Sequence, residues 1–538
     1  MKRVALFPIT LLCFSLQAMF ILESPAPQAS LTSDCHVYSP APLVEWNKTY
    51  GTKYWEDAYS GVQTSDGGYA IAGTILYQDG YSKFLLVKTD AYGNQQWNKT
   101  YGLPYEPYGY TEEDWAFSLV QTTDGGYAIA GVRLRYGIGP GDFWLVKTDA
   151  TGNMQWNKTY GGTGDDWAYS VIQTTDGGYA IVGYTTSFGA GGEDMWLVKT
   201  DAYGNVDWNK TYGGTSDEKA YSVIQTVDGG YTLAGRALGF CLVKTDALGN
   251  TEWNKTYGSG TASSVIQTND EGYGLAGYTS DGYGLTDVWL VKTDFTGNIE
   301  WNKTCGGKYW DLGSDVIQTV DGGYAIAGFT MSFGAGEYDF WLVKTDASGN
   351  ILWNETYGGA QDDYAFFVVQ TMDGGLAIAG TTESFGAGRS DFWLIKLAPT
   401  SPAITATVDI HPNALNLRNR GQSITAYIEL QKNYNVNDIN ISTVTLNDTI
   451  PAEAKPIAIG DYDNDTIPDL MIKFDRAEVI SYALANVDIT ELIEERFMTV
   501  TLAISGYLNE GTPFQGSDTI KIILPTPMYG RFRGMLPI

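Results

Sequence analysis

Histidine, cysteine and basic residues are scarce in this chain of 538 residues. Only two histidines are present, His36 and His411, and both lie outside the repeated region, so the repeats offer no histidine for a triad, zinc ligation or acid–base work. The 33 Lys and Arg residues face 62 Asp and Glu residues, which gives a net charge of −29. Because phosphate binding requires clustered Lys and Arg, this balance argues against a nucleic-acid partner. The acidity either keeps an extracellular protein soluble or attracts a cation or a cationic partner.

Long apolar runs are also scarce, with one exception at the N-terminus. Lys2 and Arg3 precede the apolar run Val4–Leu22, and the turn-forming stretch Ser24–Ser30 follows it. This layout predicts a secretory signal over residues 1–29, a lead over residues 30–42, and an extracellular or cell-surface location. An uncleaved membrane anchor is the alternative, and it is the only membrane connection that the sequence offers.

The four cysteines are too few for a disulfide scaffold. Cys13 lies in the predicted signal, Cys241 takes a position that other repeats fill with Trp, and Cys305 takes a position that they fill with Tyr. Both are therefore expected to be small buried hydrophobic residues. A bridge between Cys241 and Cys305 is the alternative in an oxidising compartment.

One motif, Trp-Asn followed by a charged residue and Thr, recurs seven times. Its intervals of 45 to 59 residues match the length of a four-stranded sheet with its turns. Three further segments rich in β-branched and aromatic residues recur between successive copies, each bounded by Gly, Asp or Asn. We therefore expect an all-β fold with a seven-bladed β-propeller over residues 43–397. The motif begins at Trp46, Trp97, Trp156, Trp208, Trp253, Trp301 and Trp353.

The two ends of the repeat region complement each other. The segment Leu43–Tyr50 has no strands of its own unit before it, and Asp391–Leu397 has no fourth strand after it. We expect these two segments to pair, so that the N-terminal strand closes the last blade and leaves no free sheet edge.

The turn before each repeated Trp resembles a known motif. The segment VKTDATGNMQW (residues 146–156) is similar to the tryptophan-docking motif of quinoprotein-type propellers, with an Asp-to-Trp step one residue shorter. The segments DGGYAIAG and DFWLVKTDASGN resemble those of secreted repeat proteins of archaea and some bacteria, which mostly have no assigned activity. The resemblance implies a propeller in which each Trp packs against the next blade, and it implies no activity.

The loops opposite the repeated turns vary most and are the expected binding face. Carboxylates and aromatic residues recur there, either to bind a glycan, a protein or a cation, or to accept backbone N–H groups of their own loops. The ligand-binding candidates are Glu56, Asp114, Trp115, Asp166, Trp167, Glu218, Trp310, Asp311 and Asp363. A second set of carboxylates opens the third strand of five units: Asp142, Asp194, Asp287, Asp339 and Asp391.

Asn-x-Ser/Thr sequons make glycosylation possible in a host that has the machinery. Seven of them belong to the repeated motif, where the Asn is expected to face away from the neighbouring blade. Asn464 also lies in such a sequon, but we expect a metal loop to exclude it. The candidates are Asn47, Asn98, Asn157, Asn209, Asn254, Asn302, Asn354, Asn440 and Asn447.

A different pattern begins after a short stiff linker at residues 398–402. Alternating segments such as ITATVDI, SITAYIEL and FMTVTLAI predict about seven strands, which is typical of an immunoglobulin-like β-sandwich over residues 403–538.

This region contains DYDNDTIPD, a segment that resembles the calcium loops of EF-hand-like and dockerin-like modules. Asp461, Asp463, Asp465 and Asp469 occupy positions 1, 3, 5 and 9, and Ile467 would supply a backbone carbonyl from position 7. The spacing predicts a Ca²⁺ site, with a solvated acidic turn as the alternative. Position 6 is Thr466 where the family has Gly, and position 12 is Ile472, so the shell would be completed by Asp475 or by water.

The sequence favours a non-catalytic binding, adhesion or scaffold protein, with no cofactor in the propeller and a glycan or an extracellular protein as its partner. A carboxylate-based glycosidase is one alternative, since two of the recurring carboxylates of the variable face could act as a catalytic pair. A quinoprotein-like dehydrogenase is the other, although the chain lacks the vicinal cysteine pair that many of those enzymes carry and has seven repeats where they usually have eight.

Overall fold

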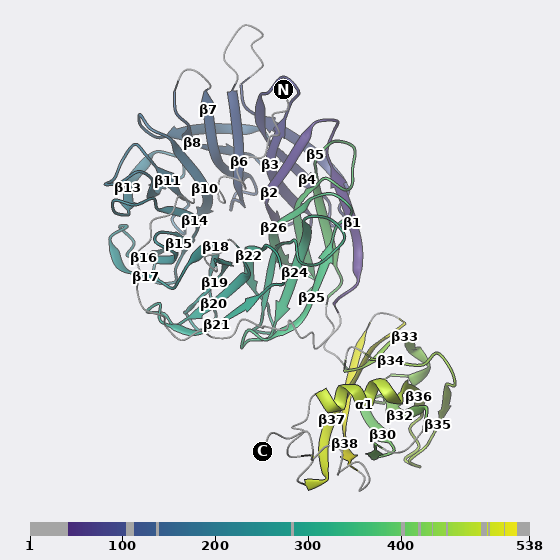
Figure 1. Ribbon diagram of the computed structural model, residues 1–538. Coiled ribbons are helices and arrows are strands. Elements are labelled where there is room, and N and C mark those ends of the chain that lie inside the picture. Colours follow the sequence, from purple (N-terminus) through teal and green to yellow (C-terminus); the bar gives the residue numbers. More distant parts are fainter. Residues whose placement is uncertain are drawn as a thin grey trace. The chain divides into compact units, whose positions relative to one another are not determined.

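The computed structural model describes most of residues 41–524 (Figure 1). The predicted signal, nearly all of the lead and three residues of the predicted linker lie outside the described residues. No helix of the described part is long and apolar enough to cross a membrane. Within 41–524, the structure does not describe 104–111, 136–138, 281–284, 400–403, 418–420, 433, 448–449, 486–491, 493–494 and 510–511.

Residues 44–397, which we call the repeat domain, form seven four-stranded antiparallel units. Five are separate sheets, and the first two are joined by one parallel bridge between Ser82 and Glu113. The first strands are β2 (Trp55–Gln63), β6 (Glu112–Gln121), β10 (Asp166–Gln173), β14 (Lys219–Gln225), β18 (Gly260–Gln267), β22 (Asp311–Gln318) and β26 (Asp363–Gln370). The second strands are β3 (Tyr69–Leu76), β7 (Tyr127–Arg135), β11 (Tyr179–Thr185), β15 (Tyr231–Arg236), β19 (Tyr273–Thr279), β23 (Tyr324–Thr330) and β27 (Leu376–Thr382).

The third and fourth strands complete each unit, and units are numbered 1 to 7 by their first strands. The third strands are β4 (Ser82–Thr89), β8 (Asp142–Thr148), β12 (Asp194–Thr200), β16 (Phe240–Thr245), β20 (Val288–Thr293), β24 (Asp339–Thr345) and β28 (Asp391–Leu397). The fourth strands are β5 (Gln95–Tyr101), β9 (Met154–Tyr160), β13 (Val206–Tyr212), β17 (Thr251–Thr256), β21 (Ile299–Cys305) and β25 (Ile351–Tyr357), with β1 (Val44–Tyr50) serving unit 7.

A lysine and an aspartate stabilise the first turn of every unit. In unit 3, the Asp176 carboxylate accepts hydrogen bonds from Gly178 N at 3.0 Å and from Lys199 Nζ at 2.7 Å. Burial alone would raise the pKa of Asp176, but bonds from Lys199 and Thr174 outweigh it and lower the pKa to about 2. The same ion pair occurs in all seven units: Lys88–Asp66, Lys147–Asp124, Lys199–Asp176, Lys244–Asp228, Lys292–Asp270, Lys344–Asp321 and Lys396–Asp373.

The repeated Trp packs against the next unit, as the motif implied. Trp156 of β9 in unit 2 lies edge-on to Tyr179 of unit 3, with ring centroids 5.8 Å apart. A Cβ atom on Gly204, in the last turn of unit 3, would lie 2.8 Å from the Trp156 ring, so this turn requires glycine. Tyr160 adds a hydrogen bond from its hydroxyl to the Gly204 carbonyl at 2.9 Å. The third-to-fourth turn of each unit is therefore a docking surface for its neighbour.

The seven units contact one another in a cyclic order. Neighbouring first strands are in contact from β2 through β26, and β26 in turn contacts β2. In each unit the residue after the first-turn Thr donates its N–H to a Gln of the following unit; for example, Thr123 N lies 2.8 Å from Gln173 Oε1. The corresponding bond from Met372 of unit 7 reaches Gln63 of unit 1 at 2.8 Å. Figure 1 shows these units following one another around a common centre.

The predicted pairing of the two ends is confirmed. Strand β1 pairs antiparallel with β28, and the register places Tyr50 opposite Phe392. The contact between units 7 and 1 is sterically distinct, because a Cβ atom on Gly61 would lie 3.0 Å from the Phe367 ring. The other units carry Ser or Asp where unit 7 has Phe367, and Val or Leu where unit 1 has Gly61.

Residues 404–524, which we call the second domain, contain two sheets over one apolar core. One sheet has the order β29 (Ile404–Thr405), β38 (Pro513–Ile523), β37 (Phe497–Leu508), β33 (Ile439–Leu446) and β34 (Ile450–Pro451), with β31 (Ala414–Asn416) also on β38. The other has the order β30 (Thr407–His411), β32 (Ser423–Glu429), β36 (Asp469–Asp475) and β35 (Ala458–Gly460). Buried residues of both sheets share the core, among them Ile428, Ile472 and Ile504.

One helix of the second domain, α1 (Arg476–Ala485), was not expected from the sequence. Asp475 caps it by accepting hydrogen bonds from Ala477 N at 2.7 Å and Glu478 N at 3.1 Å. Val479 and Ala483, one turn apart, are both fully buried and fix the helix to the core. A short 3₁₀ helix, η2 (Val436–Asp438), precedes β33.

The two cysteines differ in state, and Cys241 is the small buried residue that the sequence predicted. Cys241 is buried and free. Cys305 is also buried, but it is disulfide-bonded. A bridge between the two is therefore excluded, and the expectation of Cys305 as an unbonded hydrophobic residue is wrong.

Candidate metal centre

The acidic loop lies between β35 and β36 in the second domain and is held by its own carboxylates. Asp461 accepts hydrogen bonds from Asp465 N and Thr466 N, both at 3.1 Å. Asp463 also accepts from Asp465 N at 3.1 Å, and Asp465 accepts from Ile467 N at 2.8 Å. The chain therefore curls around its acidic side chains, as the spacing predicted.

Two residues of this loop adopt a backbone conformation that side chains usually avoid. Asn464 has φ of 66° and Thr466 has φ of 78°. Asn tolerates this region, but a β-branched residue there is an outlier, and Thr466 stands where calcium loops of the resembling families carry Gly. The sharp turn is thus made without glycine.

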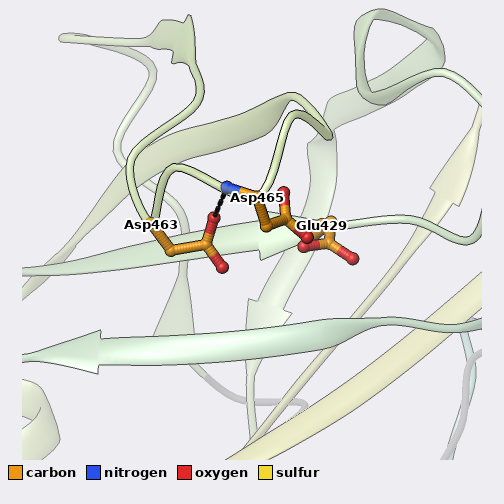
Figure 2. Close-up of side chains that lie close together, drawn as sticks. All are labelled: Glu429, Asp463 and Asp465. Carbon is orange, nitrogen blue, oxygen red and sulfur yellow. Dashed lines mark hydrogen bonds between the residues drawn. The ribbon is translucent and has the colours of Figure 1, made fainter.

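Five carboxylates converge on the loop. Oxygen atoms of Asp461, Asp463 and Asp469 lie within 4.8 Å of one another, and so do oxygen atoms of Glu429, Asp463 and Asp465. Asp469 is buried and accepts a hydrogen bond from Tyr462 N at 2.8 Å. Figure 2 shows Glu429 beside Asp465, with Asp463 bonded to the Asp465 N–H.

Glu429 completes the set that the sequence left open. It ends β32, and the register of β32 with β36 places it directly opposite Asp469. Ile472, at position 12 of the loop, is fully buried in the core and can offer no side-chain ligand. The alternative that Asp475 completes the shell is wrong, because its carboxylate caps α1. No pattern within the loop could reveal Glu429, since its position depends on the pairing of two distant strands.

The charges of this cluster are not balanced by protein groups. Burial raises the pKa of Asp469, and the negative charges of Asp463, Asp465 and Asp461 raise it further. The pKa of Glu429 is raised for the same reasons, burial first and then Asp465, Asp463 and Asp469. Within the described residues, no Lys, Arg or His forms a salt bridge with any of the five. Ca²⁺ takes six to eight oxygen ligands, so this donor set fits that ion.

The carboxylates predicted on the variable face of the repeat domain are buried, which favours loop contacts over ligand binding for this set. Exposure is 0% for Glu56, Asp114, Asp166, Asp311 and Asp363, and 6% for Glu218. The second set is also recessed: Asp194, Asp339 and Asp391 are buried, and Asp142 and Asp287 are half-buried.

These carboxylates hold loops together instead. Asp166 accepts hydrogen bonds from Gly162 N at 2.9 Å and Ser187 Oγ at 2.7 Å. A Cβ atom on Gly161 would lie 1.9 Å from Asp142 Oδ1 and 2.7 Å from Asp166 Oδ2, so the two acids close over a glycine between units. The geometry supports the loop-stabilising interpretation of this set.

Asp114 has a different partner. Its carboxylate accepts hydrogen bonds from Arg133 Nε at 3.0 Å and from Arg133 Nη2 at 3.3 Å. The third strand of unit 1 opens with Ser82 where five other units have Asp. The arginine thus occurs at the interface where one of the two acids is missing.

The aromatic candidates are less exposed than the sequence suggested. Trp115 is 6% exposed, whereas Trp167 and Trp310 are half-buried. The Trp167 ring lies 6.2 Å from both Phe117 and Tyr184 at small interplanar angles. Only Trp167 and Trp310 of the three therefore remain available to a ligand.

The repeated sequon has a structural role that sequence reasoning missed. In unit 2, the Asn157 side-chain oxygen accepts a hydrogen bond from Trp144 Nε1 at 3.1 Å, which satisfies a buried indole. The same bond occurs at Asn47, Asn209, Asn302 and Asn354. Sequence alone could have suggested it, because Trp lies 13 residues before Asn in four of these units and the third and fourth strands pair. The remaining sequon candidates, Asn98, Asn254, Asn440 and Asn447, have no such bond in the structure.

Bulges in the first strands place side chains toward one another near the centre of the repeat domain. In β10 the register shifts between Ala168 and Ser170, which leaves Tyr169 unpaired. Tyr169 lies 5.4 Å from Phe117 of unit 2 and 5.1 Å from Tyr221 of unit 4, measured between ring centroids. Tyr59 and Phe366 extend this row, and Ser263 and Ser314 occupy the same position in units 5 and 6.

Comparisons with known proteins identify no family. No protein-family model and no curated protein matches the chain. Among solved structures, a protein of unknown function from Bacteroides caccae is 12% identical with a TM-score of 0.33, and the match covers 53% of this chain and 94% of that one. Sqt1 from Chaetomium thermophilum is 11% identical with a TM-score of 0.40, covering 66% and 100%. The WD40 domain of Pan2 from Neurospora crassa is 10% identical with a TM-score of 0.40, covering 65% and 90%. These values support no statement about function.

Proposed function

We propose that the chain is a non-catalytic binding or scaffold protein of the cell exterior: a closed seven-bladed β-propeller joined to an immunoglobulin-like sandwich that binds Ca²⁺. The observation that carries the proposal is the convergence of Glu429 with Asp461, Asp463, Asp465 and Asp469. Five carboxylates that lack a basic partner among the described residues repel one another, and a divalent cation removes this repulsion.

An extracellular or cell-surface location is supported by three features. The predicted signal precedes the repeats, the net charge of −29 favours solubility, and Cys305 is disulfide-bonded. Disulfides persist in oxidising compartments and are rare in the cytosol. Calcium is abundant in the same surroundings, so a site of modest affinity would be occupied there.

The repeat domain fits a scaffold better than an enzyme. Its repeated Asp, Lys, Trp and Asn residues satisfy one another, and the buried acids of the variable face hold loops. A glycan or protein partner would contact the half-buried Trp167 and Trp310 and the exposed tips of those loops. The high proportion of acidic residues makes nucleic acid an unsuitable partner.

Calcium titration of the full chain by isothermal calorimetry tests the metal site. We expect one saturable Ca²⁺ site, lost in the double variant Asp463→Asn, Asp465→Asn and weakened at least about tenfold in Glu429→Gln, since each lost charged ligand removes on the order of 1.4 kcal/mol or more. Asp475→Asn is the matched control, because Asp475 ends β36, the strand that Asp469 begins, but its carboxylate caps α1. A chain that takes up no Ca²⁺, or loses it equally in Asp475→Asn, contradicts the proposal.

A carboxylate-based glycosidase is the second candidate, and one group favours it. Glu383 is an exposed residue, yet partial burial of its carboxyl group and the charges of Asp362, Asp57 and Asp363 raise its pKa to about 7. A carboxylic acid whose pKa is raised to near neutrality is what a glycosidase acid requires.

Release of reducing sugar from a panel of plant and bacterial polysaccharides tests this second function. We expect no release from the wild-type chain. Release that disappears in Glu383→Gln but persists in Glu355→Gln, a control at an exposed glutamate of β25, would replace the scaffold proposal with the enzyme. No observation within the described residues favours the quinoprotein-like dehydrogenase.

A further inference from the structure

A cleft in the second domain adjoins the acidic loop. It has a volume of about 570 Å³, within the range of small-ligand sites. Its lining combines apolar residues with polar ones from the segment before β33: Leu430, Lys432, Tyr434, Asn435, Val436, Asn437, Asp438, Ile467, Pro468 and Leu508. The sequence analysis did not single out any of these residues as part of a cleft.

The floor of the cleft is rigid and the polar groups are available. Leu430, Val436 and Leu508 are at most 4% exposed and belong to the core. Tyr434 is 40% exposed, and its hydroxyl forms no hydrogen bond within the described residues. The side chains of Lys432 and Asp438 likewise form no hydrogen bond or ion pair there. The cleft thus offers an aromatic face, an ammonium and a carboxylate around an apolar floor.

Hydrogen bonds hold the turn that carries Asn437 and Asp438. Asn435 caps η2 by accepting hydrogen bonds from Asn437 N at 3.0 Å and Asn437 Nδ2 at 2.8 Å. Asn509 N donates to the Asp438 carbonyl at 2.6 Å, which ties the turn to the end of β37. The Asn437 side-chain carbonyl, the Tyr434 ring and the Asp438 carboxylate are therefore presented on a fixed turn.

Both sides of the cleft are attached to metal-site carboxylates. Leu430 follows Glu429 directly, and Ile467 donates its N–H to Asp465 at 2.8 Å. Pro468 precedes Asp469, whose carboxylate accepts the Tyr462 N–H. Without a cation, repulsion among the five carboxylates acts on these same segments, so a metal ion bound there would act on the walls of the cleft.

We propose that this cleft is a calcium-dependent glycan-binding site. A sugar ring presents C–H groups that pack on an aromatic face and hydroxyls that bond to amide, carboxylate and ammonium groups, and the cleft supplies each of them from Tyr434, Asn437, Asp438 and Lys432. A charged ligand would need an excess of one sign, whereas one Lys and one Asp line this cleft. The inference rests on the proposed calcium site and assigns it a ligand class.

Binding of the full chain to immobilised cello-, xylo-, manno- and chito-oligosaccharides tests the site, in calcium and in EGTA. We expect saturable binding to at least one oligosaccharide in calcium and a loss of at least about tenfold in EGTA. Tyr434→Ala and Asn437→Ala should each weaken that binding about tenfold or more while leaving calcium uptake by calorimetry unchanged. Phe497→Ala is the matched control, because this aromatic residue of the second domain is similarly exposed, at 41%, but does not line the cleft.

The outcomes separate this inference from the proposal beneath it. No binding to any of the oligosaccharides by a chain that takes up calcium overturns the glycan site and leaves the metal site standing. Binding that survives Tyr434→Ala but is lost in Trp167→Ala moves the glycan to the repeat domain and overturns the cleft. No calcium uptake overturns both.

Discussion

The two domains treat their carboxylates in opposite ways. In the repeat domain, every first-turn Asp has a Lys from the third strand of the same unit within 3 Å. In the second domain, five carboxylates converge without a basic partner among the described residues. The first arrangement is complete when the chain folds, whereas the second, in our proposal, is completed by a cation. The comparison separates stability that the sequence encodes from stability that depends on the surroundings.

Removal of calcium should have the largest effect and should affect one domain only. At a calcium concentration about 100-fold above Kd, binding stabilises the folded state by about 2.7 kcal/mol. For a domain of this size we expect the midpoint of the second-domain transition to fall by about 10 °C in EGTA, with no change in the repeat-domain transition. Differential scanning calorimetry of the full chain, with magnesium as the control ion, measures both transitions. Equal shifts of both would remove the distinction between the domains.

Gly161→Ala should produce the converse result, weakening the repeat domain alone. The added Cβ would lie 1.9 Å from Asp142 Oδ1 and 2.7 Å from Asp166 Oδ2, so both carboxylates must move. Overpacking of this kind costs about 1–3 kcal/mol. Gly214→Ala is the control, because nothing lies within 4 Å of its Cβ position. The calorimetric midpoint of the repeat domain should fall by a few degrees for Gly161→Ala only; an equal fall for Gly214→Ala would show a backbone effect instead.

Acid should act on the two domains with opposite sign when calcium is absent. The first-turn carboxylates Asp66, Asp124 and Asp176 have pKa values lowered to about 2, so their contribution is present above pH ~4 and is lost as the pH falls toward 2. Glu429 and Asp469 have raised pKa values, so in EGTA they take up protons at a higher pH than ordinary carboxyl groups do, which relieves the repulsion as the pH falls. We expect the second-domain midpoint to rise as the pH is lowered from neutral, whereas the first-turn ion pairs of the repeat domain are lost only below pH ~4. A parallel fall of both midpoints in thermal melts at these pH values would contradict the assignment.

Loss of one lysine that pairs with a first-turn aspartate should have the smallest effect. In Lys199→Met the Asp176 carboxylate loses its partner, but it is half-exposed and water replaces much of the interaction. We expect about 0.5–1 kcal/mol less stability for the repeat domain in urea unfolding and a rise in the Asp176 pKa toward its ordinary value, measured by NMR titration. Lys210→Met, at an exposed lysine of β13, should leave both quantities unchanged.

The sequence predicted the repeat domain well because its information is local and repeated. Strand positions follow from short patterned segments, and the pairing of β1 with β28 follows from what each end lacks. The docking of Trp156 on the next unit followed from the motif. The burial of Asp166 did not, because a carboxylate before a strand can either face solvent or accept loop N–H groups, and only the loop path decides between them.

The second domain was harder because its contacts are distant along the chain. The four loop aspartates could be found from their spacing, but Glu429 reaches them only through the register of β32 with β36. Helix α1 has few residues and begins directly at the end of a strand, where the capping Asp475 could equally have been a ligand. The hydrogen bond between Trp144 and Asn157 could have been predicted from their spacing, but the Asn-x-Thr pattern suggested glycosylation instead.

The strand β1 also sets a timetable for the nascent chain. It is synthesised first among the described strands, but its partner begins at Asp391, about 350 residues later. At a synthesis rate of about 5–20 residues per second, β1 waits roughly 20–70 s for that partner. During this interval its hydrogen-bonding edges are unpaired, and an unpaired strand is a template for aggregation. The repeat domain can therefore close only after β28, its last strand, has been synthesised and has paired with β1.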